Sequence, residues 1–442
     1  MNPQDLAATV LDLVGDRADA EVVVTSGNSA LTRFANSFIH QNVAEEGSAV
    51  SLRLAVDGRV SSAQTTNIEG DSLARFVDAT IEAAGHQPVD PEWPGLAPPA
   101  EVPGVDHFDA ATAEATPADR AACVKAFVDA GRGMLAAGYC ETIGHEVAFA
   151  NSAGQTAFGR YTTATLDGIH QSGTSAGSGH AASQRLADLD GAAVGALAAQ
   201  RAADSADTYD IKPGEYGVVL APECVASIAV FFAAYGFNAK SHAEGQSFAE
   251  PGVQQFDAAI SIRDDALDPA AFGVGFDTEG TPRRTVALVR NGVTESLAHD
   301  RRTARAAGVE STGHGGPGSE VWGPFPASVF VEGGDDDVES MIAGIDRGLY
   351  IATFNYCRVL EPKSLVVTGL TRNGTFMIEN GRITGAVTNL RFTQSFVAAL
   401  GAGRVLGIGN DARHADSEFG AGIIHAPSLH LAGWNFTGGA EG

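Results

Sequence analysis

The chain has 442 residues, with 54 acidic and 28 basic side chains and a formal net charge of −26 at pH 7. Nucleic-acid binding depends on lysine and arginine side chains that displace condensed counterions from phosphates, so a surface this acidic argues against direct DNA contact. A chain of this length is too long for one simple core. We therefore expect two or three packed units.

Cysteine usage and the first residues indicate where the protein works. The four cysteines are widely spaced and include no Cys-x-x-Cys pair, which is typical of reduced thiols in a cytosolic protein. The start, Met1-Asn-Pro-Gln-Asp5, lacks the basic residues and long apolar run of a signal peptide. No window reaches transmembrane length. We expect a cytoplasmic protein without a membrane partner.

Residues 1–90 alternate helix and strand signals. Asn2 can cap a first helix, and a second helix is predicted to begin at Asp71. Between them, apolar residues alternate over 50–56 and lead into Asp57-Gly58, a dipeptide typical of a type I′ hairpin turn. These patterns predict an N-terminal unit of helices packed on antiparallel strands.

Residues 91–208 are predicted to form a connector and a second α+β unit. Six prolines lie between residues 87 and 116, a density that prevents both helix and central strand. A hairpin is predicted around Asn151-Ser-Ala-Gly154, and the alanine-rich segment 190–206 predicts a helix. The Gly/Ser run 172–179 is interpreted as a mobile loop.

Residues 209–442 predict a β-rich C-terminal domain with a buried central helix. The segment 222–236 is small or apolar at nearly every position, with no charge after Glu223; a helix that is apolar on all sides belongs in a core. Asn-Gly pairs at residue 291 and residue 380 predict hairpin turns. Residues 338–349 predict an amphipathic helix. The fold class is therefore α+β.

Several segments resemble the TldD/PmbA family, also called modulator of DNA gyrase, whose founding pair form a two-subunit metalloprotease. The similar segments run along the whole chain and are best marked in its last third: Asn151-Ser-Ala-Gly154, Ala306-Ala-Gly-Val-Glu-Ser-Thr-Gly313, Gly348-Leu-Tyr-Ile-Ala352, Met377-Ile-Glu-Asn-Gly-Arg-Ile383 and Thr437-Gly-Gly439.

Within that family the chain resembles the PmbA branch, also called TldE, which lacks the metal motif. In TldD-type subunits the helix at 222–236 carries His-Glu-x-x-x-His, and its two histidines and glutamate fall here on Val230, Tyr235 and Phe231. A zinc ligand must offer a lone pair, and a general base must accept a proton; Val and Phe do neither. A C-terminal cysteine, the third zinc ligand in TldD-type chains, is also missing, since the last cysteine here is Cys357.

The resemblance implies a non-catalytic subunit of a heterodimeric TldD/TldE-type zinc metalloprotease that processes or degrades small unfolded peptides. The partner would be a TldD-type paralogue with the His-Glu-x-x-x-His motif, which would hold the zinc, and no cofactor is expected in this chain. Extended peptides would bind by adding a strand to an exposed sheet edge. The resemblance leaves open whether the isolated chain forms homodimers.

Two other groups of residues could line a substrate groove or bind a metal ion. His242 and Glu244 follow the core helix and are candidates for lining the substrate groove. Asp411, His414 and Asp416 are the most ligand-like cluster, with a solvated acidic turn as the simpler interpretation. These residues would serve the first alternative function, an independent metallohydrolase with a non-standard metal site. The second alternative is a regulatory binding protein without a proteolytic role.

Overall fold

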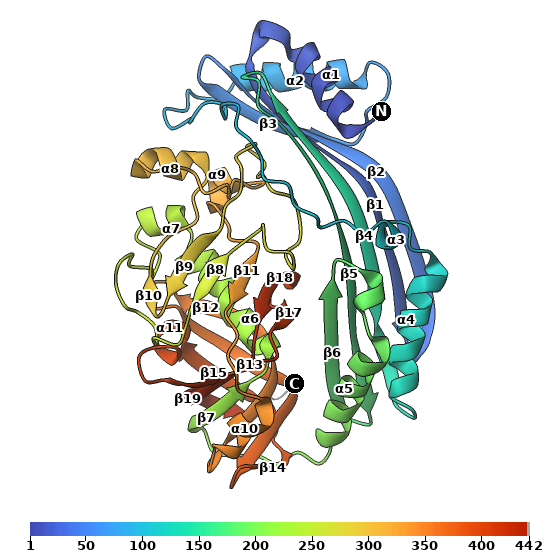
Figure 1. Cartoon of the computed structure of the whole chain (residues 1–442), viewed down its shortest axis with the longest axis vertical. Coiled ribbons are helices and arrows are strands. Elements are labelled where there is room, and N and C mark those ends of the chain that lie inside the picture. Colours follow the sequence, from blue (N-terminus) through green and yellow to red (C-terminus); the bar gives the residue numbers. More distant parts are fainter. Residues whose placement is uncertain (440–442) are drawn as a thin grey trace.

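The structure is a computed structural model that describes residues 1–439, and in this range it combines helices with three β-sheets (Figure 1). Helices and strands are mixed along the whole chain, and strands dominate its second half. The predicted α+β class with a β-rich C-terminal region is confirmed. None of the described helices is long and apolar enough to cross a lipid bilayer.

The first sheet is long and curved, and it takes strands from both sides of residue 90 (Figure 1). Its strand order is β3-β2-β1-β4-β5-β6, and all neighbours pair antiparallel. The strands are β1 (Asp19–Ala35), β2 (Phe38–Val56), β3 (Arg59–Thr65), β4 (Leu135–Asn151), β5 (Thr156–Ser172) and β6 (Ser175–Ser183). The predicted boundary at residue 90 thus divides one sheet, whereas the boundary at 208 precedes the other two sheets.

Local turn chemistry sets the register of this sheet. Asp57 and Gly58 adopt φ angles of 50° and 74° and connect β2 to β3, as a type I′ hairpin requires. The strand faces alternate: Val22 and Val24 are buried under helices, while Glu21 and Val23 face the C-terminal half of the chain. One face of the sheet is therefore a core and the other is the wall of a cleft.

Two pairs of helices cover the core face. The first pair packs on β1 and β2 at one end of the sheet, and the second pair packs on β4, β5 and β6 at the other end. Thr116 and Asp119 form a reciprocal capping box at the start of α4, as the Thr-Pro sequence favours. The helical elements of this half are α1 (Pro3–Val14), α2 (Ser72–Gly85), α3 (Ala110–Ala113), α4 (Pro117–Ala130), α5 (Gly191–Asp204) and the 3₁₀ turns Gly15–Arg17 and Leu186–Asp188.

The Gly/Ser run 172–179 forms the tight turn between β5 and β6 and the first part of β6, and not the mobile loop that its composition predicts. Strand β6 pairs with β5 over Ala164↔Ser183 to Ser172↔Ser175. A Cβ atom on Gly177 would lie 2.3 Å from the carbonyl oxygen of Ala198, and one on Gly179 would lie 2.4 Å from that of Val194. The glycines therefore let α5 pack directly on the strand, a use of glycine that composition alone does not distinguish from flexibility.

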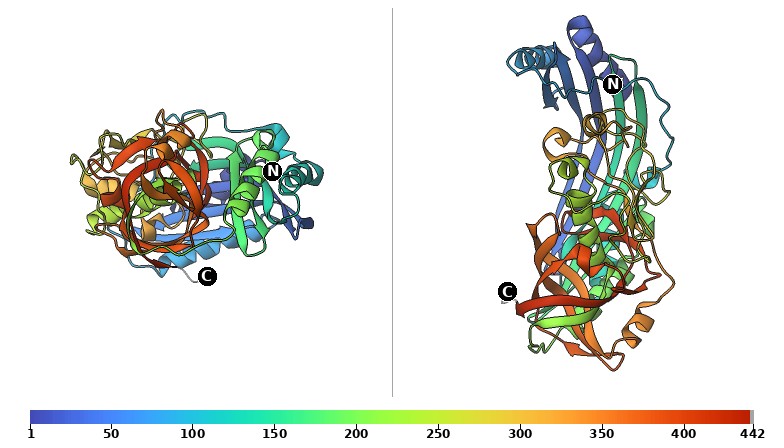
Figure 2. Two further views of the ribbon diagram at one scale, coloured as in Figure 1. Left: turned by 90° about the horizontal axis from the view of Figure 1, so that it is seen from below. Right: turned by 90° about the vertical axis from the view of Figure 1, so that its left-hand side faces the viewer.

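The C-terminal half contains two further sheets. The second sheet has the order β10-β9-β8-β11-β18-β17, and the third has the order β12-β7-β19-β15-β13-β14, with β16 paired to β19. Pairing of β12 with β13 closes the third sheet into a ring, which Figure 2 shows end-on. Both predicted Asn-Gly hairpins are present, between β9 and β10 and between β13 and β14. The strands are β7 (Gly214–Leu220), β8 (Ile262–Asp264), β9 (Val286–Arg290), β10 (Val293–Thr294), β11 (Val329–Val331), β12 (Arg347–Glu361), β13 (Val366–Glu379), β14 (Arg382–Ala386), β15 (Leu390–Ser395), β16 (Val405–Ile408), β17 (Arg413–Ser417), β18 (Gly420–Ala426) and β19 (Leu429–Gly439).

The predicted central helix is confirmed as α6 (Pro222–Phe231), and all ten of its residues are buried. One π-helical turn, Phe232–Gly236, continues it. The helix packs against β12 of the third sheet and against β17 and β18 of the second sheet. It therefore joins the two C-terminal sheets into one core.

The amphipathic helix predicted over 338–349 is shorter than its pattern indicates. The structure has α10 at Val338–Ala343, and Leu349 lies on β12. Ile345 and Leu349 are still buried, so the apolar spacing continues across the helix end into the strand and mimics a longer helix. The other short helices of this half are α7 (Ala239–Ala243), α8 (Arg301–Ala307), α9 (Ser319–Trp322) and α11 (Phe396–Ala399).

Candidate functional site

The three positions that the resemblance assigns to the metal motif, Val230, Phe231 and Tyr235, lie at the C-terminal end of α6 and in the π turn. Val230 is 0% exposed and Phe231 is 2% exposed, and Tyr235 is partly buried. The ring centroids of Phe231 and Tyr235 are 6.0 Å apart. Two of the three positions therefore offer only hydrocarbon, and the third offers a phenol.

Other aromatic rings complete this cluster. The ring of Phe231 lies 6.0 Å from that of Phe396 on α11 and 5.3 Å from that of Phe419 in the β17–β18 turn. Phe419 is 52% exposed, so the cluster reaches the surface at that point. These side chains do not fit a zinc ion, because none of the phenylalanines can act as a ligand.

The other predicted residues are scattered. His242 lies on the short helix α7, and Glu244 follows directly after it. Both side chains are exposed, and Glu244 pairs with Lys240 at 3.5 Å. Their role in a substrate groove stays a prediction.

The acidic cluster near the C-terminus has separate partners. Asp411 accepts hydrogen bonds from the backbone N–H and the hydroxyl of Ser428, at 2.8 and 2.7 Å. His414 Nε2 lies 2.7 Å from the carbonyl oxygen of Ala270, and burial lowers the pKa of this imidazole to about 4. Within residues 1–439, no three His, Cys, Asp or Glu side chains gather as a set of metal ligands.

Asp416 instead lines a polar pocket that the sequence does not predict. This pocket, called here the interdomain pocket, has a volume of about 400 Å³ and lies between the first sheet and the C-terminal half. Strand β6 contacts β13 and β17 of the C-terminal half, and Figure 1 shows it running beside them. Its charged and polar lining residues include Asp167, His180, Glu223, Asn355, Arg372, Asn373 and Asp416.

Glu223 holds the pocket together at the first turn of α6. Its Oε1 accepts a hydrogen bond of 2.7 Å from Arg413 on β17, and its Oε2 lies 3.9 Å from Arg201 on α5. Burial raises the pKa of this carboxyl, but attraction to Arg413 and Arg201 more than offsets it and holds the pKa below its ordinary value. The carboxylate is therefore charged and joins three elements. The only feature of the sequence that singles out Glu223 is that it is the one charged residue in an apolar helix.

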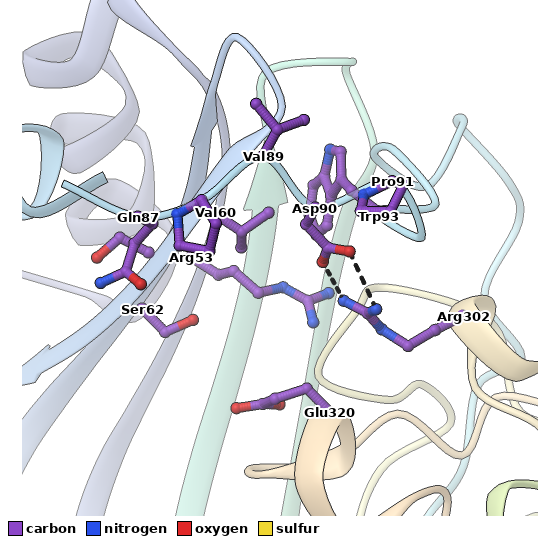
Figure 3. A pocket seen from close by; sticks show the side chains of 12 residues that line it. Arg53, Val60, Ser62, Gln87, Val89, Asp90, Pro91, Trp93, Arg302 and Glu320 are labelled. Atoms are coloured by element: carbon purple, nitrogen blue, oxygen red, sulfur yellow. Dashed lines mark hydrogen bonds and ion pairs between the residues drawn. The ribbon is translucent and has the colours of Figure 1, made fainter. Parts of the chain in front are cut away.

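A second charged cluster lies in the cleft further along the first sheet. Arg53 on β2 pairs with Glu21 and, at 2.9 Å, with Glu279. Burial, partly offset by Arg53, raises the pKa of Glu21 to about 7. Figure 3 shows Arg53 in a pocket of about 570 Å³ beside Arg302, which pairs with Asp90 of the connector. This cluster fastens the N-terminal sheet to α8.

Comparison with known proteins identifies the family. Residues 213–438 match the model "PmbA/TldA metallopeptidase C-terminal domain", and residues 20–84 match "PmbA/TldA metallopeptidase domain 1". The metalloprotease TldD homologues of Buchnera aphidicola and Haemophilus influenzae are 27% and 25% identical over 130 and 128 residues, which are 29% and 28% of this chain. The match spans about a quarter of those relatives, 26% of each.

Solved structures share the fold over nearly the whole chain. TldE from Thermococcus kodakarensis superposes with a TM-score of 0.88 at 18% identity, covering 98% of this chain and 99% of that one. A protein from Thermotoga maritima described as a modulator of DNA gyrase gives 0.84, also at 18% identity, with coverage of 98% and 99%. The C-terminal model alone spans more than half of the sequence, and the chain therefore belongs to the TldD/PmbA metallopeptidase family.

Proposed function

We propose that this chain is the non-catalytic subunit of a heterodimeric TldD/TldE-type zinc metalloprotease that processes or degrades small unfolded peptides. The observation that carries the proposal is the aromatic packing at Val230, Phe231 and Tyr235, the positions at which TldD-type chains carry their motif. Hydrocarbon there cannot bind zinc or activate a water molecule. The zinc would be held by a TldD-type paralogue, and no catalytic step is assigned to this chain.

The fold suggests what such a subunit would contribute. Its first sheet and its C-terminal half enclose a cleft lined by polar and charged residues, and its sheets end in edge strands to which an extended peptide can add by backbone hydrogen bonds. Binding through the backbone places few demands on peptide sequence. The net charge of −26 disfavours a nucleic-acid partner. The complex would work in the cytoplasm.

The test is metal content and peptidase activity in three preparations. We expect neither zinc nor cleavage of an unfolded peptide with the chain alone, and both in a stable complex with a His-Glu-x-x-x-His paralogue. The matched control is the same complex with the motif glutamate of the paralogue replaced by glutamine, which should retain zinc and lose cleavage. Stoichiometric metal and cleavage by the lone chain would overturn the proposal. That result would favour an independent metallohydrolase at His242 or His414.

A further inference from the structure

The interdomain pocket lies at the opposite end of α6 from the degenerate motif. Glu223 is in the first turn of this helix, and Tyr235 is in the π turn that follows it. At roughly 1.5 Å per residue, the two ends are on the order of 15 Å apart. A volume of about 400 Å³ is within the range of small-molecule sites. The pocket is therefore separate from the aromatic cluster and large enough for a ligand.

Two buried polar side chains of the pocket, His180 and Glu223, have atoms without a hydrogen-bond partner among the described residues. The side chain of His180 is 4% exposed, yet within residues 1–439 neither ring nitrogen makes a hydrogen bond. Its Nδ1 atom lies 3.4 Å from Oδ2 of Asp167 without forming one. Oε2 of Glu223 is also buried and lacks a hydrogen bond. Because native proteins pair nearly all buried polar atoms, such a cluster indicates a ligand or ordered water.

The charge of the floor selects a cationic group. Asp167, Glu223 and Asp416 come together there from β5, α6 and β17. Arg413 and Arg201 counterbalance Glu223, whereas no lysine or arginine among the described residues forms a salt bridge with Asp167 or Asp416. Burial and repulsion from Asp167 raise the pKa of Asp416 to about 6. A bound ammonium group would supply a positive charge beside these two carboxylates and donate hydrogen bonds to their oxygens.

Other residues that line the pocket carry groups of the complementary kind. Asn355, Arg372 and Asn373 come from β12 and β13, where the strand pairing is interrupted by a bulge between Asn355 and Arg358. Asn373 and Tyr356 adopt φ angles of 55° and 56°, which are uncommon for residues other than glycine. Bulges re-aim side chains and are frequent beside functional sites. These residues offer two amides and a guanidinium, which suit peptide groups and a carboxylate.

We propose that the interdomain pocket binds small zwitterions that carry an α-ammonium and a carboxylate, with the ammonium at Asp167, Glu223 and Asp416 and the carboxylate at Arg372. Short peptides and free amino acids share this chemistry. The choice of short peptides, the products of peptide degradation, rests on the proposed function. The isolated chain would then recognise the ends of cleavage products without carrying out the cleavage.

Isothermal titration calorimetry of the isolated full chain tests the site. Trialanine should bind saturably, N-acetyl-trialanine should bind about tenfold more weakly because it lacks the ammonium, and trialanine amide should be weakened because it lacks the carboxylate. Free alanine is the probe for the other ligand class. If it binds as well as trialanine, the pocket is a site for free amino acids. Equal binding of the acetylated peptide, or no saturable binding of trialanine, would overturn the proposal.

Variants locate the binding. Asp416→Asn keeps the shape of the side chain and should weaken trialanine binding about tenfold, whereas Asp129→Asn, on the exposed surface of α4, should leave it unchanged. If Asp416→Asn fails to fold, the comparison of trialanine with its acetylated form still decides. An unchanged affinity of folded Asp416→Asn would contradict the assignment. If the chain binds trialanine but does not co-purify with a His-Glu-x-x-x-His paralogue, only the proposed function is rejected. If the two chains co-purify but trialanine does not bind, only the proposed pocket is rejected.

Discussion

Replacing Phe231 by alanine tests whether the degenerate motif is a packed core. Its ring is 2% exposed and contacts the rings of Tyr235, Phe396 and Phe419. Removing a buried phenylalanine ring costs about 3–5 kcal/mol of unfolding free energy. Because Phe419 is 52% exposed and can move into the space, we expect the lower end, about 3 kcal/mol. Phe231→Leu, which keeps most of the volume, should cost about 1 kcal/mol.

The assay is guanidinium unfolding, followed by tryptophan fluorescence, of the parent chain and matched variants. Phe231→Glu restores the motif residue and should cost more than Phe231→Ala at pH 7, because a carboxylate would be buried among aromatic rings. Tyr235→Phe removes one hydroxyl at a partly exposed position and should change stability by less than about 0.5 kcal/mol. A loss below about 1 kcal/mol for Phe231→Ala, or a tolerated Phe231→Glu, would refute the interpretation of a filled site.

Three further substitutions test other parts of the structure by denaturant unfolding. The pKa of His414 is lowered from 6.5 to about 4 in the folded chain, so its contribution to stability is complete above pH 6.5 and is lost as the pH falls towards 4. His414→Gln should remove about 3 kcal/mol of that acid-induced loss. Glu223→Gln should cost about 2–4 kcal/mol, because it leaves Arg413 without its buried counter-ion. Gly195→Ala should cost about 1–3 kcal/mol, because a Cβ atom there would lie 2.3 Å from the carbonyl oxygen of Phe127.

Each of these predictions has its own control. Gly85→Ala lies in α2, where a Cβ atom meets nothing within 4 Å, and should be neutral or stabilising by up to about 1 kcal/mol. His86→Gln, at an exposed position, should follow the parent chain at every pH. Arg413→Met combined with Glu223→Gln should recover part of the loss. Parallel pH profiles for His414→Gln and the parent, or equal effects at Gly195 and Gly85, would contradict the respective argument.

The fold could be predicted where the signal is local. Asp57-Gly58 specifies its hairpin through its own backbone preferences, and the all-round apolar segment 222–236 identifies a buried helix from composition alone. The prediction of a mobile loop at residues 172–179 was wrong. The glycines there are required by close packing against α5, which lies further along the chain. Close packing between distant elements leaves the same glycine-rich pattern as a flexible loop.

The candidate site divides in the same way. The sequence alone shows that Val230 and Phe231 cannot bind a metal, because neither side chain carries a ligand atom. The interdomain pocket could not be predicted, since Asp167, His180 and Asp416 come together only when β5, β6 and β17 meet. None of these residues belongs to a local motif. The sequence gave two partial signals, the lone charge of Glu223 in its apolar segment and the acidic cluster that contains Asp416, and neither indicated a shared pocket.

Under the proposed function, the two ends of α6 explain how this chain could lose the metal motif and keep the fold of its family. At the C-terminal end, Phe231 adds buried apolar area, which stabilises the core more than histidine and glutamate without a metal would. At the N-terminal end, Glu223 is held by Arg201 from α5 and Arg413 from β17, so the attachment of the first sheet to the C-terminal half does not depend on the motif. The motif positions and the polar pocket therefore occupy different turns of one helix. Under the proposed function, aromatic rings would replace the zinc site at the first while the polar pocket beside the second is retained.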